Sequence, residues 1–124
     1  MNATERIAEF KRAVAGLDQA LVLAHGNPLG VDASIQRFEF CVELAWKSLR
    51  EILLRDHSLE TASPKTTLQA AYRVALIGDE ATWLAMLRDR NLSSHTYREA
   101  LAREIFGRLP AYLAEFKRLT QALA

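Results

Sequence analysis

The sequence predicts an all-α fold, an antiparallel four- to five-helix bundle, and three observations favour it. Apolar residues recur at spacings of three and four along most of the chain, which is the pattern of amphipathic helices. Residues that interrupt helices leave only short connections, and these favour antiparallel neighbours. No run of β-branched residues alternates with polar ones over the length of a strand. With 124 residues, half of them apolar, the chain can bury a core of its own, so we expect one domain spanning residues 1–124.

The first two helices carry the clearest pattern. The first has a stripe with 3-4-3-4-3 spacing that comprises Ile7, Phe10, Val14, Leu17, Leu21 and Ala24. A second helix is predicted over Ala33–Asp56, and we expect it to be the most buried. Its stripe repeats the spacing and comprises Ile35, Phe38, Val42, Ala45, Leu49 and Ile52. Residues 25–30 are rich in Gly, Pro and Asn and predict the loop between the two helices, after which Asp32 or Ser34 can cap the second.

The third and fourth helices are predicted to be shorter. Ser63 and Pro64 predict the start of the third, because serine caps helices and proline suits the first helical position. Gly78 predicts its end, since glycine commonly follows the last helical residue. Asp79 can cap the fourth helix, whose apolar residues extend to Leu92.

Polar residues at 93–96 predict a break before the last helix. Thr96 and Glu99 have the spacing of a capping box, so we expect this helix to begin near Tyr97. Its apolar stripe comprises Leu101, Ile105, Leu109, Tyr112, Phe116, Leu119 and Leu123. Stripes of this kind also suit pairing between the helices of two chains, and we expect a homodimer.

Composition excludes several classes of protein. Cys41 is the single cysteine, so it can form neither an intramolecular disulfide nor a cysteine-based zinc site, and we expect it to be a small buried hydrophobe. The three histidines lie too far apart in the sequence for an i, i+4 metal pair, and we predict no metal site. No apolar run approaches the roughly 18 residues of a membrane span, and the N-terminal residues lack the apolar core of a signal peptide. We therefore expect a cytoplasmic protein without membrane association.

Charge is balanced overall but unevenly distributed. The chain has 16 basic and 15 acidic residues. Residues 1–84 carry a net charge of −2, and residues 85–124 carry +3. No general basic surface for nucleic acid is indicated, and the last third is the part best suited to a polyanion.

The stretch from Arg88 to Tyr97 concentrates groups that can carry chemistry, with Leu92 its single aliphatic residue. A guanidinium can clamp a phosphate through two hydrogen bonds, and an imidazole can exchange a proton at neutral pH. Together they suffice for metal-free RNA cleavage in which the 2′-hydroxyl is the internal nucleophile. One histidine does not easily serve as both acid and base in a single turnover, so a dimer would supply the second copy.

A structural interpretation of the same residues stays open. Arg90 can pair with Asp89 or with an acid on another helix, which is worth about 0–1 kcal/mol at a surface. His95 can bond a helix-terminal carbonyl, and Tyr97 can pack its ring in the core. On this interpretation the chain is a dimerisation module whose polar stretch only caps a helix. Similarly, the spacing of Glu43 and Lys47 fits an ordinary ion pair or support for the site.

Three blocks of sequence resemble the HEPN superfamily of helical bundles, and within it the HepT-like, or nucleotidyltransferase substrate-binding, proteins. They are FEFCVELAWK at residues 38–47, SPK at 63–65 followed by AAY at 70–72, and WLAMLRDRNLSSHTY at 83–97. The resemblance covers about residues 5–120, and its last block is the most specific. The resemblance implies a HEPN-like bundle with a ribonuclease site formed by residues of this last block.

The resemblance also implies a role for each site residue. HEPN ribonucleases carry an R-x4–6-H motif that HepT-like members extend to R-x4-H-x-Y, and Arg90, His95 and Tyr97 fit it without a gap. Carried over, Arg90 binds the scissile phosphate, His95 transfers protons, and Asn91 assists orientation.

Finally, the resemblance implies a partner, a minimal nucleotidyltransferase encoded alongside in a two-gene, toxin–antitoxin-like module. That partner, using ATP and Mg²⁺, is expected to attach AMP to Tyr97 and so silence the ribonuclease, because the added phosphate would occupy the anion site. The chain itself is expected to need no cofactor. The alternative is a non-catalytic subunit that binds substrate or nucleotide for the nucleotidyltransferase.

Overall fold

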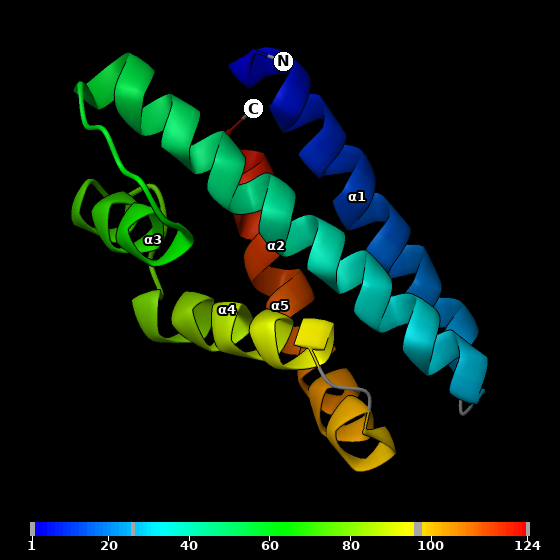
Figure 1. The fold of residues 1–124 in the computed structure, drawn as a ribbon. Helices are drawn as coiled ribbons and strands as arrows, with labels where there is room; N and C mark the ends of the chain where they lie inside the picture. Colours follow the sequence, from blue (N-terminus) through cyan, green and yellow to red (C-terminus); the bar gives the residue numbers. More distant parts are fainter. Residues whose placement is uncertain (1, 26, 96–97, 124) are drawn as a thin grey trace.

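The structure, a computed structural model, describes residues 2–25, 27–95 and 98–123. Over these ranges the chain forms helices and no strand (Figure 1). The helices are α1 (Ala3–Ala24), α2 (Pro28–His57), α3 (Pro64–Arg73), α4 (Glu80–His95) and α5 (Glu99–Ala122). The predicted all-α bundle is confirmed.

Helix α2 is the centre of this arrangement. It runs antiparallel to α1, and the two lie side by side along most of their length (Figure 1). Helix α5 packs against both of them, while α3 and α4 contact α2 away from α1. Among the described helices, α2 is the one that contacts all the others, which confirms the prediction that the second helix is the most buried.

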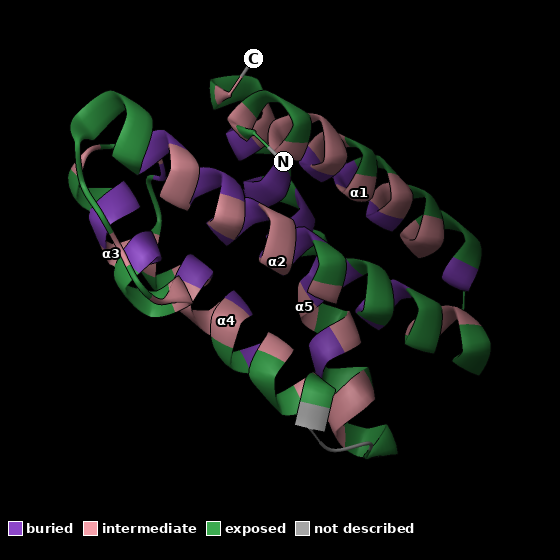
Figure 2. Cartoon of the chain, turned by 45° about the horizontal axis from the view of Figure 1, so that its top comes forward, coloured by how far each residue is buried: buried purple, intermediate pink, exposed green. Residues whose placement is uncertain are grey.

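The core is apolar and rich in aromatic rings, and the buried faces of the helices point toward one another (Figure 2). Phe38 of α2 stacks on Tyr112 of α5 with ring centroids 5.4 Å apart. Phe116 meets Phe10 of α1 and Trp83 of α4 edge to face, at 6.1 and 5.6 Å. Aromatic pairs in these geometries add to the stabilisation from buried area, so this cluster joins α1, α2, α4 and α5 around one core.

Helix α2 begins earlier than predicted. It starts at Pro28, because the side chain of Asn27 accepts a hydrogen bond from the backbone of Leu29 and proline suits the first turn. The predicted caps Asp32 and Ser34 are therefore wrong, and Ser34 is instead buried, donating to the carbonyl of Gly30 at 2.8 Å. The absence of a side chain at Gly30 matters, since a Cβ there would lie 2.7 Å from the Cα of Ala24 at the end of α1.

The other predicted ends are partly confirmed. The side chains of Ser63 and Asp79 accept backbone hydrogen bonds at the starts of α3 and α4, as expected. Helix α3 ends at Arg73, before the predicted Gly78, and Ala75 follows with a left-handed φ of 63°. Helix α5 begins at Glu99, two residues after the predicted start, and Arg98 occupies its cap position without a side-chain bond.

The predicted break at residues 93–96 is wrong for its first three residues, which continue α4. Serine is unfavourable in the interior of a helix because its hydroxyl can hydrogen bond to backbone groups that the helix would otherwise pair. Here the single hydroxyl hydrogen of Ser93 is shared between Glu39 of α2 at 2.7 Å and the carbonyl of Arg90 at 3.1 Å, so the hydroxyl is satisfied without ending the helix. Thr96, the predicted cap of the last helix, lies outside the described residues.

A buried polar cluster determines how α4 meets α5. Asp89 has no exposed surface, and its carboxylate accepts two hydrogen bonds from Arg108 at 2.7 and 2.9 Å. The hydroxyl of Tyr112 donates a third at 2.6 Å. Burial and the bond to Asp89 raise the pKa of Tyr112 to about 12, so its hydroxyl stays protonated and donating. Since successive helical residues are about 100° apart, α4 turns Arg90 toward α2 while Asp89 faces α5.

Loss of Arg108 leaves the buried carboxylate of Asp89 with one short hydrogen bond, from Tyr112, and a longer ion pair with Arg88 at 3.9 Å. We expect Arg108→Met to lower the free energy of unfolding by about 3 kcal/mol, at the low end for breaking a buried pair because Arg108 is partly exposed. Urea unfolding measures the loss. As a control, Arg103→Met breaks an exposed pair with Glu99 on the same helix and is expected to cost about 0–1 kcal/mol. Equal losses in the two variants would contradict the role given to Asp89.

Cys41 is fully buried, as predicted, and burial raises the pKa of its thiol from 9.0 to about 12, against a smaller lowering by the charge of Arg37. The thiolate is the reactive form, and three pKa units reduce its fraction near neutral pH about a thousandfold. We therefore expect iodoacetamide to modify Cys41 at least about a thousandfold more slowly in the folded protein than in concentrated urea. Mass spectrometry over time measures both rates, and similar rates would show that the thiol is accessible.

Candidate functional site

Arg90 of α4 is held by a carboxylate on the neighbouring helix. Its Nη2 donates to Oε2 of Glu43 on α2 at 2.7 Å, and its Nη1 donates to Oδ1 of Asn91 at 3.2 Å. The side chain of Arg90 keeps 30% of its surface exposed, and that of Glu43 keeps 32%. The guanidinium is thus positioned by the fold and still reachable from solvent.

The carboxylate of Glu43 accepts hydrogen bonds from three side chains, of which Arg90 is the first. Lys47 donates to its Oε1 at 2.9 Å, one turn along α2, so the predicted ion pair is confirmed. Trp46, which is nearly buried and lies under the guanidinium of Arg50, donates to Oε2 at 3.1 Å. Burial alone would raise the pKa of Glu43, but these hydrogen bonds and the charges of Lys47 and Arg90 lower it below its usual value. The carboxylate is therefore ionised at neutral pH.

One turn earlier on α2, Glu39 accepts the hydroxyls that follow Arg90. Both Ser93 and Ser94 donate to its Oε2 at 2.7 Å. Glu39 and Glu43 are four positions apart on α2, and Arg90, Ser93 and Ser94 have the spacing of one face of α4. The two helices therefore meet through a polar seam over the last turns of α4.

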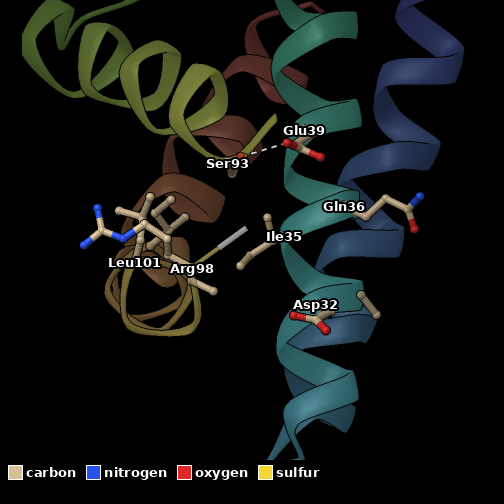
Figure 3. Close-up of a pocket in the computed structure, with 10 residues that line it drawn as sticks. Asp32, Ile35, Gln36, Glu39, Ser93, Arg98 and Leu101 are labelled. Atoms are coloured by element: carbon tan, nitrogen blue, oxygen red, sulfur yellow. Dashed lines mark hydrogen bonds between the residues drawn. The ribbon is translucent and has the colours of Figure 1, made fainter. Parts of the chain in front are cut away.

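A groove of about 540 Å³ adjoins this seam. It is lined by Asp32, Ala33, Ile35, Gln36, Glu39, Ser93, Arg98, Leu101, Ala102 and Ile105, from α2, α4 and the start of α5. Figure 3 shows Glu39 bonded to Ser93 at its upper edge, Ile35 inside it, and the guanidinium of Arg98 directed away from α2. Half of these lining residues are apolar and half are polar or charged, and the volume lies within the range of small-molecule sites.

The structure tests the predicted site residues unequally. Arg90 and Asn91 lie next to each other on α4 and are hydrogen bonded. His95 is the last residue of α4, and its side chain lies outside the described part of the chain. Tyr97 also lies outside the described residues. The arrangement of Arg90 relative to these two side chains therefore stays a prediction.

Two features of the site go beyond the prediction from the sequence. Of the two partners expected for Arg90, the acid on another helix is confirmed, whereas Asp89 instead binds Arg108 and Tyr112. The bonds of Ser93 and Ser94 to Glu39 are not among the sequence predictions. The signal was present in the spacing, because an acidic i, i+4 pair on α2 matches polar residues at i, i+3 and i+4 on α4.

The arrangement is suited to binding an anion. A partly exposed guanidinium with its orientation restrained can donate further hydrogen bonds to a phosphate. Over the described ranges, no His, Cys, Asp and Glu side chains gather in a group of three that could hold a metal ion. Nor does the described part contain a helix both long and apolar enough to cross a membrane.

Comparison with known proteins relates this site to a family. Residues 5–124 match the family model described as nucleotidyltransferase substrate binding protein like. A Haemophilus influenzae protein named probable ribonuclease HepT is 32% identical over 97 residues, which cover 75% of this chain and 66% of that protein. The match thus leaves about a third of the relative's length uncovered.

Solved structures share the fold. A Thermus thermophilus protein superposes with a TM-score of 0.86 and 40% identity, covering 92% of this chain and 98% of the other. A Haemophilus influenzae protein, described as showing the fold of a substrate binding domain of a nucleotidyltransferase, has a TM-score of 0.85 and 27% identity, covering 94% and 98%. Because residues 5–124, nearly the whole chain, match the family model, the chain belongs to the HepT-like family of nucleotidyltransferase substrate-binding proteins.

Proposed function

We propose that this chain is the HepT-like partner of a minimal nucleotidyltransferase, and that in its unmodified form it cleaves RNA without a metal ion. The observation that carries the proposal is Arg90, a restrained and solvent-accessible guanidinium on the helix that bears the R-x4-H-x-Y motif. The relative named probable ribonuclease HepT supports the same activity. The sequence and the geometry of Arg90 therefore favour one chemistry.

In the proposed reaction the RNA supplies its own nucleophile. The 2′-hydroxyl oxygen attacks the adjacent phosphorus, the bond to the 5′-oxygen breaks, and the products are a 2′,3′-cyclic phosphate and a 5′-hydroxyl. Arg90 binds the phosphate and stabilises the charge that develops on its oxygens. His95 takes up the proton of the 2′-hydroxyl or delivers one to the leaving oxygen, and Asn91 orients Arg90 through the bond between them.

A homodimer completes this proposal. One imidazole does not readily serve both proton transfers in a turnover, and a second copy of the motif would provide the other. The C-terminal end of α4 carries exposed residues, Asn91 and Ser94 among them. A dimer formed at this end would bring two motifs together.

The nucleotidyltransferase is proposed to regulate the site. Using ATP and Mg²⁺, it would transfer AMP to Tyr97, with the phenol oxygen attacking the α-phosphorus and pyrophosphate leaving. Tyr97 lies seven positions after Arg90 in the sequence, so the new phosphodiester would place a negative charge near the guanidinium. That charge would compete with RNA for Arg90 and silence cleavage.

A second candidate function has its own support. The structural relative described as a substrate binding domain favours a non-catalytic subunit that binds a substrate or nucleotide for the nucleotidyltransferase. The groove beside Glu39 and Ser93 has the volume of a small-molecule site, which fits this alternative. On this view Arg90 binds a phosphate group without cleaving RNA.

Variants of the motif distinguish the two functions. We expect Arg90→Ala and His95→Ala each to reduce RNA cleavage at least about 100-fold, because each removes a group that acts in the transition state. Cleavage of labelled RNA by protein purified without its partner measures this, with circular dichroism to verify folding. Arg88→Ala is the matched control, since Arg88 is a largely exposed cation on the same helix whose ion pair with Asp89 is long, at 3.9 Å, and this variant should retain activity. No cleavage by the clean, unmodified wild type would instead favour the binding subunit.

Tyr97 is the proposed acceptor of AMP. Incubation with ATP, Mg²⁺ and the neighbouring nucleotidyltransferase should add the mass of AMP to the wild type and abolish RNA cleavage, because the phosphate occupies the anion site. Mass spectrometry of the intact chain and of its peptides measures the transfer. Tyr97→Phe should remain unlabelled, whereas Tyr72→Phe, which alters an exposed tyrosine on α3, should be labelled like the wild type. Full labelling of Tyr97→Phe would show that another residue is the acceptor.

A further inference from the structure

We infer that Glu43 is a positioning residue that holds the guanidinium of Arg90 for the scissile phosphate, an inference that rests on the proposed RNA cleavage. As a consequence of its negative charge, Glu43 also weakens RNA binding. The two residues lie 47 positions apart and on different helices, joined by a bond of 2.7 Å. The inference gives α2 a part in a reaction whose motif lies entirely on α4 and the residues after it.

The bond restrains Arg90 without blocking it. A guanidinium has five N–H groups. One on Nη2 donates to Glu43, and one on Nη1 donates to Asn91 at 3.2 Å. Three N–H groups remain for a phosphate, on a side chain that keeps 30% of its surface exposed. Glu43 and Asn91 therefore restrain the guanidinium through both Nη atoms while other N–H groups stay available to a ligand.

Glu43 is itself immobilised, which makes it an effective anchor. Lys47 and Trp46 donate to its two oxygens at 2.9 and 3.1 Å, and the indole of Trp46 is held between the core and the guanidinium of Arg50. An acceptor held in this way cannot follow the movements of Arg90. The long arginine side chain then has less freedom to lose when it meets the transition state.

The same carboxylate opposes an incoming phosphate. Glu43 carries a negative charge beside the group that attracts RNA, and like charges at such distances repel even near a surface. Removal of this charge alone should therefore strengthen RNA binding. If Glu43 positions Arg90, its loss should therefore have two opposite effects: RNA should bind more tightly, and RNA cleavage should become slower.

Glu51 offers a contrast on the same helix. It accepts from Nε of Arg6 at 2.7 Å, the same distance as in the pair formed by Glu43, but it lies two turns further along α2 and its partner is on α1. Both pairs join α2 to another helix through a partly buried carboxylate. Only the pair of Glu43 includes a residue of the motif, so Glu51 supplies a matched control.

Two substitutions test the charge of Glu43 and the length of its side chain separately. Glu43→Gln removes the charge and keeps the length, and we expect about threefold to tenfold tighter binding of an uncleavable 2′-O-methyl RNA with kcat lower by at least about tenfold. Glu43→Asp keeps the charge but shortens the side chain, and we expect a similar fall in kcat with binding unchanged. Glu51→Gln should alter neither value. Fluorescence anisotropy measures binding, single-turnover cleavage measures the rate, and thermal unfolding verifies that each variant folds.

A readout without RNA cleavage keeps this inference separate from the proposed function. In the wild type, the ¹⁵N-attached guanidinium protons of Arg90 should exchange slowly with water, and in Glu43→Gln they should exchange at least about tenfold faster. NMR measures this, with the Arg90 signal assigned by its loss in Arg90→Lys. If the wild type cleaves no RNA but this change in exchange is seen, the ribonuclease function fails while Glu43 still positions Arg90. If cleavage depends on Arg90 but Glu43→Gln matches the wild type in kcat, binding and exchange, Glu43 has no such role.

Discussion

The carboxylate of Asp89 must find its hydrogen bonds inside the protein, because its side chain has no contact with solvent. Arg108 and Tyr112 provide them from two successive turns of α5. An apolar contact tolerates small rotations of a helix, whereas three short polar bonds do not, so this cluster sets the rotation of α4 about its axis. Every later property of the site depends on that rotation, since it decides which residues of α4 turn toward α2.

Given that rotation, the polar residues of α4 meet acidic residues of α2 rather than water. Arg90 reaches Glu43, while Ser93 and Ser94 reach Glu39 one turn earlier. These bonds lie at the edge of the core, where both partners keep some exposure and where water can still enter. A site in this position combines the rigidity of packed helices with access for a ligand, which is what binding an anion in a defined orientation requires.

Pairing within the protein and a role in function are compatible for Arg90. A surface ion pair contributes little to stability, so the bond to Glu43 is a modest part of what holds the bundle together. Its larger effect is on the arginine itself, which loses conformational freedom before any ligand arrives. The structural interpretation of Arg90 is therefore confirmed by its pair with Glu43, and this pair is compatible with the proposed function. Under the proposed function, the ligand that this restrained guanidinium meets is a phosphate.

Much of the fold follows from the sequence alone. The 3-4 spacing identified the helices and their buried faces, and local signals identified the caps at Ser63 and Asp79. These features depend on residues within a turn of one another, which is why periodicity and capping reveal them. The continuation of α4 through Ser93 and the partners of Asp89 and Arg90 were decided only by the tertiary structure. Periodicity states which face of a helix is buried but not how two helices are rotated and shifted against each other, and the bonds of Arg90 and Ser93 join residues 47 and 54 positions apart.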